Sequence, residues 1–388
     1  MESVFFPIQT GWTAWQEIWI HPLWIAALLL AAWQYAWKGI REQRCFGRRL
    51  HPPTPLFLRT VLVGLGGGVV FSMTASFITA GIRPAEAVWV WGILLLLTCI
   101  RLRFACPAYA VGLLALISMG AAEAGLQTGI GGEWTAVLWK FSVVEWLFLV
   151  SGLHGLEWAL VRLDGEAGST PVVERDGDNQ PVGGYLLQKI WPLPLVLVTP
   201  AGWLPLPLVA SFARINLSRP PEQQKRRSSS LILLYAFLLA GLAGIAKVWP
   251  PMLWVASLFC IAGHEGIYQL GRYRERRRLS FFAAVSGGIR VLAVWPGSPA
   301  EDMGICPGDI LHRVNGEPVS DLAGLREALT RSPAFCKLEL TDENGDPKLA
   351  HRPVYEGDPD HLGIVEAPSP GRPDRLSSDL SSASEGKR

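Results

Sequence analysis

The residues of this sequence that could take part in catalysis or metal binding are histidines and acids inside long apolar segments. The run from His264 to Tyr268 reads His-Glu-Gly-Ile-Tyr. It differs by one residue from the H-E-x-x-H pattern, in which two histidines one helical turn apart bind zinc and the glutamate activates water. Tyr268 stands where the second histidine is required, so the pattern for metal-assisted hydrolysis is broken.

Other ionisable residues lie in apolar segments too. Glu145 precedes His154 and Glu157, which are one helical turn apart. Ionisable residues in membrane segments are costly and therefore suggest a function. A composite metal site of His154, Glu157, His264 and Glu265 is one interpretation; helix-to-helix hydrogen bonding is the simpler one. We therefore predict no catalytic residue, no metal and no cofactor.

Further catalytic signatures are missing from the sequence. It contains no G-x-S-x-G nucleophile motif. The glycine-rich run 64–68 lies in an apolar segment, where small residues favour close helix packing over phosphate binding. The cysteines show no C-x-x-C spacing, which predicts reduced, structural thiols instead of a disulfide framework or zinc cluster. They are Cys45, Cys99, Cys106, Cys260, Cys306 and Cys336.

The elements that must position these residues are membrane helices. Of the 388 residues, half are apolar and only 18% are charged, against about 25% charged in soluble domains. Seventeen tryptophans fit a lipid–water interface, while a net charge of +2 disfavours a nucleic-acid partner. We predict a polytopic α-helical bundle of about seven spans, with six to eight considered, each of roughly 20 residues. The expected spans are 18–37, 56–80, 87–100, 105–122, 135–153, 231–248 and 252–270.

An eighth apolar segment, residues 190–212, holds five prolines. Proline removes a backbone donor and disrupts a helix, so we predict a re-entrant or interfacial segment instead of a full crossing. Basic residues follow the first span and the last, where five arginines lie within 272–278. Because basic loops stay cytoplasmic, we expect the N-terminus outside and the C-terminus in the cytoplasm.

Composition also divides the chain into domains. The hydrophilic segment 163–189 is expected to be a cytoplasmic loop, with a small hairpin around Asp176-Gly177. The Ser- and Pro-rich end has little to bury and is predicted to be disordered. The expected order is a membrane domain over 1–270, a basic juxtamembrane linker over 271–284, a small α+β, β-barrel-like domain over 285–366, and a tail over 367–388.

The small domain carries the most specific pattern. Residues 288–296 alternate as a half-buried strand. Ser298 offers a helix cap and Gly304 a left-handed helix stop, and Asn315-Gly316 is a strong hairpin signal. The run G-S-P-A-x-x-x-G-x-x-P-G-D-I-L-x-x-V-N-G-x-x-V resembles a PDZ domain. The resemblance implies binding of an extended peptide, often a C-terminus, by strand addition.

A PDZ domain needs a loop whose backbone amides receive the peptide carboxylate, and two segments compete for this role. Leu362, Gly363 and Ile364 would place the loop at the C-terminal end, as in circularly permuted domains. The segment Leu279–Phe282 would keep the unpermuted order, but adjoins the membrane. We favour the first, because glycine lets a ligand approach the backbone.

The facing helix of the predicted domain contains Leu325 and Leu329. Both leucines are candidates for the walls of the peptide groove. The alternative is that they only pack the core of the domain. A strand hairpin over 336–341 and 348–355 is expected to complete the domain.

Features along the whole chain resemble the MinJ family. They are His154-Gly-Leu-Glu-Trp158, the following hydrophilic segment, Ile190-Trp-Pro-Leu-Pro194 and the terminal PDZ-like domain. The MinJ family comprises cell-division topology adaptors of Gram-positive bacteria. The resemblance implies a non-enzymatic scaffold in the bacterial cell membrane, at the septum or pole, that links DivIVA-like to MinD-like proteins and thereby restricts FtsZ assembly.

Two alternative functions remain open. A PDZ-like domain attached to a membrane bundle also resembles site-2 proteases, which implies an intramembrane protease or metal enzyme with a substrate-presenting PDZ domain. The second alternative is a transporter that uses the membrane acids and is regulated by the PDZ domain. The expected partners of the favoured scaffold are membrane lipid and peptide tails, with no nucleic acid.

Overall fold

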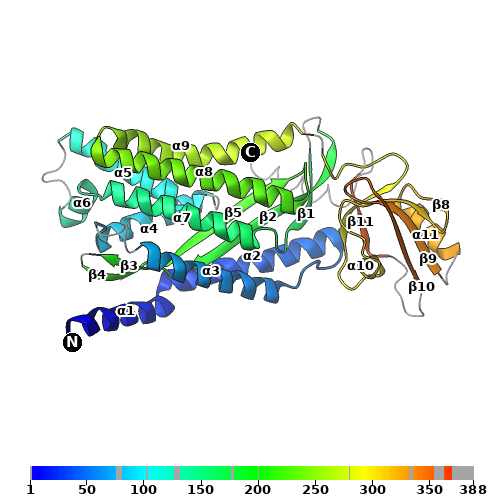
Figure 1. The fold of residues 1–388 in the computed structure, drawn as a ribbon, viewed down its shortest axis with the longest axis horizontal. Coiled ribbons are helices and arrows are strands. Elements are labelled where there is room, and N and C mark those ends of the chain that lie inside the picture. The colour runs from blue at the N-terminus through cyan, green and yellow to red at the C-terminus, as the bar shows by residue number, and fades with distance from the viewer. Residues whose placement is uncertain are drawn as a thin grey trace.

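The computed structural model consists of a helical module with strands packed inside it, and a β-rich domain at one end (Figure 1). The structure describes residues 2–75, 81–101, 104–125, 132–175, 179–199, 201–278, 280–331, 335–353 and 362–368. Nearly all of the predicted tail, and the Asp176-Gly177 turn, therefore lie outside the described residues.

Long helices form most of the module, and five of them start on a proline. Proline suits the first helical position, where its fixed φ fits and no N–H is needed. The helices are α1 (Glu2–Ile20), α2 (Pro22–Phe46), α3 (Pro53–Ala75), α4 (Pro84–Ile100), α5 (Pro107–Glu123), α6 (Gly132–Trp139), α7 (Val143–Asp164), α8 (Pro221–Val248) and α9 (Met252–Arg276).

Fewer helices than predicted qualify as membrane spans. Within the described residues, α3, α7 and α8 are long and apolar enough to cross a bilayer. A fourth span results if 11–20 and α2 count as one, although the chain bends by 50° between them. Helices α4 and α5 are apolar but have only 17 residues each. The count of about seven spans is therefore not confirmed.

The predicted span 135–153 is interrupted, which the sequence analysis did not anticipate. Helix α6 ends at Trp139 and α7 begins at Val143. The buried carboxylate of Glu86 accepts hydrogen bonds from the Ser142 backbone N–H, at 3.1 Å, and from the Trp146 indole N–H, at 2.8 Å. A buried acceptor that captures a backbone donor at this point holds the break in place.

Most described residues of 190–212 lie in strands, so the segment is not a helical crossing, as its prolines predicted. Its re-entrant or interfacial placement stays a prediction. The strands are β1 (Thr170–Arg175), β2 (Pro181–Leu193), β3 (Val196–Thr199), β4 (Gly202–Pro205) and β5 (Leu208–Asn216). Their antiparallel order is β1-β2-β5, with β3 and β4 as a separate hairpin. The β1–β2 pairing, with Arg175 opposite Pro181, confirms the predicted hairpin. The segment 163–189, which was expected to be a loop, therefore consists mainly of the end of α7, strand β1 and part of strand β2.

Close packing against α3 gives the strands their place. A Cβ atom added at Gly64 would lie 2.3 Å from the Pro192 carbonyl oxygen, and one at Gly68 would lie 2.7 Å from Pro194 Cδ. The glycine-rich run therefore permits a close approach, as expected, but of a strand and not of another helix. Strand β2 packs on α2 and α3, while β5 packs on α7 and α9.

A buried group of charges ties β2 to the end of α7. Lys189 on β2 donates to Asp164 at 3.0 Å, and both side chains are almost fully buried. The Trp191 indole donates to the same carboxylate oxygen at 3.1 Å. Arg59 on α3 pairs with the other Asp164 oxygen at 2.7 Å. One carboxylate thus joins a helix end, a strand and a third element.

The C-terminal domain contains a sheet of order β10-β9-β7-β6-β11, with β8 paired to β7. Pairing of β9 with β10 confirms the predicted hairpin. Burial raises the pKa of the Cys336 thiol in its core to about 11, so this cysteine stays protonated. The elements are β6 (Ile289–Val294), α10 (Pro299–Asp302), β7 (Ile310–Val314), β8 (Glu317–Pro318), α11 (Leu322–Arg331), β9 (Phe335–Thr341), β10 (Pro347–Pro353) and β11 (Ile364–Glu366).

Substitution of Asp164 tests the buried charge group. Asp164→Ala leaves the Lys189 ammonium buried without its carboxylate, and we expect a loss of about 3–5 kcal/mol in unfolding free energy. Arg226→Ala, which removes the exposed pair with Glu222, should cost at most about 0.5 kcal/mol. Thermal unfolding of the detergent-solubilised protein measures both. Equal effects of the two variants would contradict this role of Asp164.

Candidate functional site

Strand β11 offers the edge that a peptide needs for strand addition. It is the last strand of the sheet and pairs with β6, Ile364 lying opposite Val294. The Trp295 N–H donates to the Gly363 carbonyl oxygen at 2.8 Å. Because hydrogen-bonded pairs alternate along an antiparallel ladder, the N–H and C=O of Ile364 are directed away from β6. A peptide strand added at this edge would pair with these two groups.

The segment before β11 has the backbone geometry of a close-approach loop. Gly363 has φ +83°, and a Cβ atom there would lie 2.3 Å from Ser298 Cβ. Ser298 caps helix α10 by accepting the Glu301 N–H, and the Ala300 N–H donates to the Leu362 carbonyl at 2.9 Å. The Gly-Ser-Pro-Ala motif and the Leu-Gly-Ile segment are therefore one structural unit, in which only glycine fits.

The competing loop is engaged elsewhere. Leu279 lies outside the described residues. The Phe281 N–H donates to the Leu217 carbonyl at 2.8 Å, and the Phe282 carbonyl accepts the Gly183 N–H at 3.1 Å. Since the helical module uses these backbone groups, 362–364 is the better candidate for receiving a carboxylate.

Helix α11 contributes one face of leucines to the domain. Leu325 is 3% exposed and belongs to the domain core. Leu329 is half-buried at the margin of that core, as is Leu322, which the sequence analysis did not single out. Leu362 and Ile364 pack into the same core. Leu325 is thus a core residue, and Leu329 with Leu322 is left as the candidate groove wall.

The C-terminal domain sits directly on the helical module (Figure 1). An apolar contact joins the two parts. Phe46, the last residue of α2, and Leu50, just after it, pack against Val365 on β11, Ala293 on β6 and Trp295, which follows β6. The turn that presents Leu50 is fixed because its N–H donates to Glu42 at 2.8 Å. We call this apolar contact the seat of the domain.

A second contact reinforces the seat. The Tyr185 hydroxyl on β2 donates to the Leu292 carbonyl, and Phe282 packs on the Tyr185 ring. Helix α9 continues to Arg276, so the predicted linker 271–284 begins as helix. The domain is therefore held by packing and hydrogen bonds and not only by a tether.

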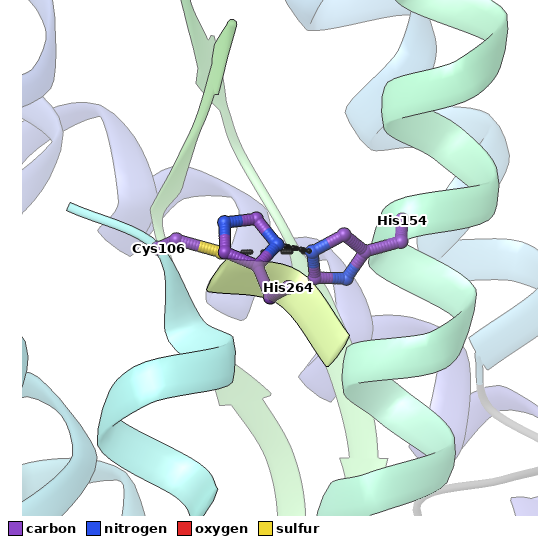
Figure 2. Close-up of side chains that lie close together, drawn as sticks. All are labelled: Cys106, His154 and His264. Carbon is purple, nitrogen blue, oxygen red and sulfur yellow. Dashed lines mark hydrogen bonds between the residues drawn. The ribbon is translucent and has the colours of Figure 1, made fainter. Parts of the chain in front are cut away.

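The membrane acids and histidines do not form one cluster. His154 and His264 meet, with His154 Nε2 and His264 Nδ1 3.1 Å apart (Figure 2). Glu157 lies beside His154 at 3.8 Å. Glu265 instead accepts the Tyr109 hydroxyl at 2.7 Å, and Glu145 packs near Gly81.

Cys106 lies beside the histidine pair, although the cluster predicted from the sequence did not include it. Its Sγ lies 3.6 Å from His154 Nε2 (Figure 2). Tyr268, at the position of the missing zinc ligand, accepts an Arg214 hydrogen bond through its carbonyl at 3.2 Å. The only sequence signal for Cys106 was its place before Pro107 at the start of α5, which says nothing about the helices that face it.

Comparison with known proteins supports both sequence resemblances. A PDZ-domain family model matches residues 290–337. The chain is 24% identical over 379 residues to the cell division topological determinant MinJ of Bacillus subtilis, covering 89% of this chain and 92% of that protein. It is 24% identical over 370 residues to a probable MinJ of Lacticaseibacillus paracasei, covering 88% and 94%. The human serine protease HTRA3 is 47% identical over 66 residues, 17% of this chain and 14% of the protease.

Alanine substitutions at Gly297 and Gly363 separate the cost of a left-handed backbone from the cost of a clash between the new Cβ atom and Ser298. Gly297 and Gly363 both have positive φ, but a Cβ atom meets nothing at Gly297 and collides with Ser298 at Gly363. Each alanine should cost about 1–2 kcal/mol for the left-handed backbone. Gly363→Ala should cost a further 1–3 kcal/mol, roughly, from overpacking. Hydrogen exchange of the β6 and β11 amides measures the difference. Equal loss of protection in both variants would contradict the fit of Gly363 to Ser298.

Proposed function

We propose that this chain is a non-enzymatic membrane scaffold of the bacterial division machinery, whose PDZ domain recruits partner proteins by their tails. The observation that carries the proposal is the coincidence of two features: similarity to MinJ proteins over nearly the whole chain, and an edge strand, β11, that shares its domain core with the leucine face of α11. Backbone hydrogen bonds to Ile364 supply affinity, and the α11 side of the groove selects side chains.

The seat gives this scaffold its mechanism. A PDZ–peptide contact of micromolar affinity is worth about 8 kcal/mol, which is weak at low cellular concentrations. Packing against Phe46 and Leu50 holds the groove at a fixed position next to the bilayer. Partners that are themselves membrane-associated then bind at a high effective concentration.

Charge distribution supports a cytoplasmic PDZ domain. Helix α2, with Arg44 in its last turn, ends at the seat. Helix α9 reaches its basic end, including Arg274, at the same end of the module (Figure 1). Basic residues stay on the cytoplasmic side, so the seat and the groove face the cytoplasm in this proposal.

The partners that we propose follow from the MinJ similarity. DivIVA-like and MinD-like proteins are the candidates, with restriction of FtsZ assembly as the outcome. Membrane lipid is the surrounding partner of the apolar helices.

A protease function is less well supported. The similarity to HTRA3 covers 14% of that protease, and the chain contains no G-x-S-x-G motif. Tyr268 leaves the His264 helix without the second histidine of H-E-x-x-H. The remaining metal-ligating residues come from different helices.

Two glutamate substitutions, one in the proposed groove wall and one on the exposed surface of β10, test whether partners bind in the groove. Leu329→Glu places a charge in the half-buried groove wall and should reduce crosslinked recovery of DivIVA-like and MinD-like proteins at least tenfold. Leu349→Glu, at a side chain that is 67% exposed on β10, should leave recovery unchanged. Unaltered recovery with Leu329→Glu, in protein that accumulates normally, would mean that partners do not use this groove.

Topology is tested separately. A reporter active only in the cytoplasm, fused after Arg388, should be active, and a periplasm- or exterior-specific reporter should be silent. Truncation after Arg278 should remove PDZ-dependent partners while membrane insertion continues. An exterior signal from the first fusion would overturn the scaffold mechanism, because division proteins of the MinD and FtsZ classes act in the cytoplasm.

A further inference from the structure

Three helices of the module bring metal-ligating side chains to one buried point. Cys106 caps α5, His154 lies in the middle of α7, and His264 lies in the middle of α9. One ligand atom from each lies within 4.8 Å of the others. Figure 2 shows the thiol and both imidazole rings turned toward one another. None of these residues belongs to the peptide groove.

The spacing of the atoms fits a tetrahedral zinc site. Zinc binds sulfur at about 2.3 Å and imidazole nitrogen at about 2.0–2.1 Å, which separates two nitrogens by roughly 3.4 Å and sulfur from nitrogen by roughly 3.6 Å. Here Cys106 Sγ and His154 Nε2 are 3.6 Å apart, and His154 Nε2 and His264 Nδ1 are 3.1 Å apart. The third pair, Cys106 Sγ and a His264 ring nitrogen, lies within 4.8 Å.

A second observation concerns the orientation of His154. Its Nδ1 lies 2.8 Å from the Val150 carbonyl oxygen. A carbonyl only accepts, so Nδ1 carries the proton and donates, and the lone pair of Nε2 is directed at Cys106 and His264. Metal-binding histidines are oriented in this way by a partner on the other ring nitrogen.

A cavity beside the three side chains leaves room for a further ligand. It has a volume of about 70 Å³ and borders His154, Glu157 and His264, which is enough for a water molecule in the fourth coordination position. The Cys106 thiolate offsets part of the charge of a divalent ion, which favours the ion in a site of low polarity. Mixed sulfur and nitrogen donors favour zinc over magnesium or calcium.

We propose that Cys106, His154 and His264 bind one Zn²⁺ that fastens α5, α7 and α9 together. The site overlaps the composite site weighed from the sequence only in part, because Cys106 is added and Glu265 is engaged by Tyr109. The proposal does not depend on the scaffold function. The three ligands come from three different helices, so the role of the ion in this proposal is to hold these helices together.

Metal analysis of the full-length protein tests this site. Protein purified in detergent without a metal-binding tag, after incubation with Zn²⁺ and gel filtration, should contain about one zinc per chain. The double variant Cys106→Ser/His264→Gln should lose at least nine-tenths of it. Cys260→Ser, a buried α9 cysteine whose thiol contacts the Ala108 carbonyl, should retain it. Loss in the Cys260 variant alone would overturn the ligand assignment.

A measurement on the unaltered chain covers the case in which the double variant does not fold. Co²⁺ added to metal-free protein should give the intense visible bands of a tetrahedral ion and a thiolate charge-transfer band, and an equivalent of Zn²⁺ should abolish both. Thermal unfolding should shift upward with Zn²⁺, because ligand binding stabilises the folded state. Absence of bound zinc and of the cobalt bands would overturn the proposal and leave a hydrogen-bonded cluster.

Discussion

The backbone of strand β2 must be hydrogen-bonded where it runs between apolar helices, and this requirement organises the helical module. Strand β1 pairs with residues 181–186 of β2 on one edge, and β5 pairs with residues 185–193 on the other. The side chains of β2 then reach in several directions. Lys189 binds Asp164 of α7, Tyr185 reaches the PDZ domain, and the backbone around Pro192 packs on Gly64 of α3. Loss of its register would disturb the helices and the seat together.

The seat changes how the PDZ domain is understood. A domain on a flexible linker samples many orientations, whereas Phe46, Leu50 and Val365 bury one face of this domain against α2. Strand β11 pairs with β6 along one edge, and its other edge is the one that we propose for a peptide. The orientation of the groove is therefore coupled to the packing of α2 and of strand β2. A change in the helical module thereby has a physical route to the peptide groove.

Polar side chains inside the helical module act mainly as ties between elements. Glu86 holds the break between α6 and α7, and Glu265 binds Tyr109 across α9 and α5. Buried polar groups without partners are costly, and these pairs remove that cost while fixing which helices meet. These contacts are consistent with the interpretation that the membrane acids form hydrogen bonds between helices. The cluster at Cys106 differs, because its sulfur and nitrogen donors are suited to a metal ion.

Features that depend on neighbours along the chain could be predicted from the sequence alone. The Gly-Ser-Pro-Ala cap, the Asn315-Gly316 turn and the alternation after Gly288 identified the PDZ domain, and the glycine in 362–364 made this segment the predicted carboxylate loop. The strands in 190–212 could not be predicted from its prolines, because they depend on the pairing of β2 with β5 and on the packing of β2 against α3. The same holds for the cluster of Cys106, His154 and His264, in which His154 lies 48 residues after Cys106 and 110 residues before His264. Local periodicity carries no information about such contacts, because they arise from how the helices pack and not from the order of residues within any one of them.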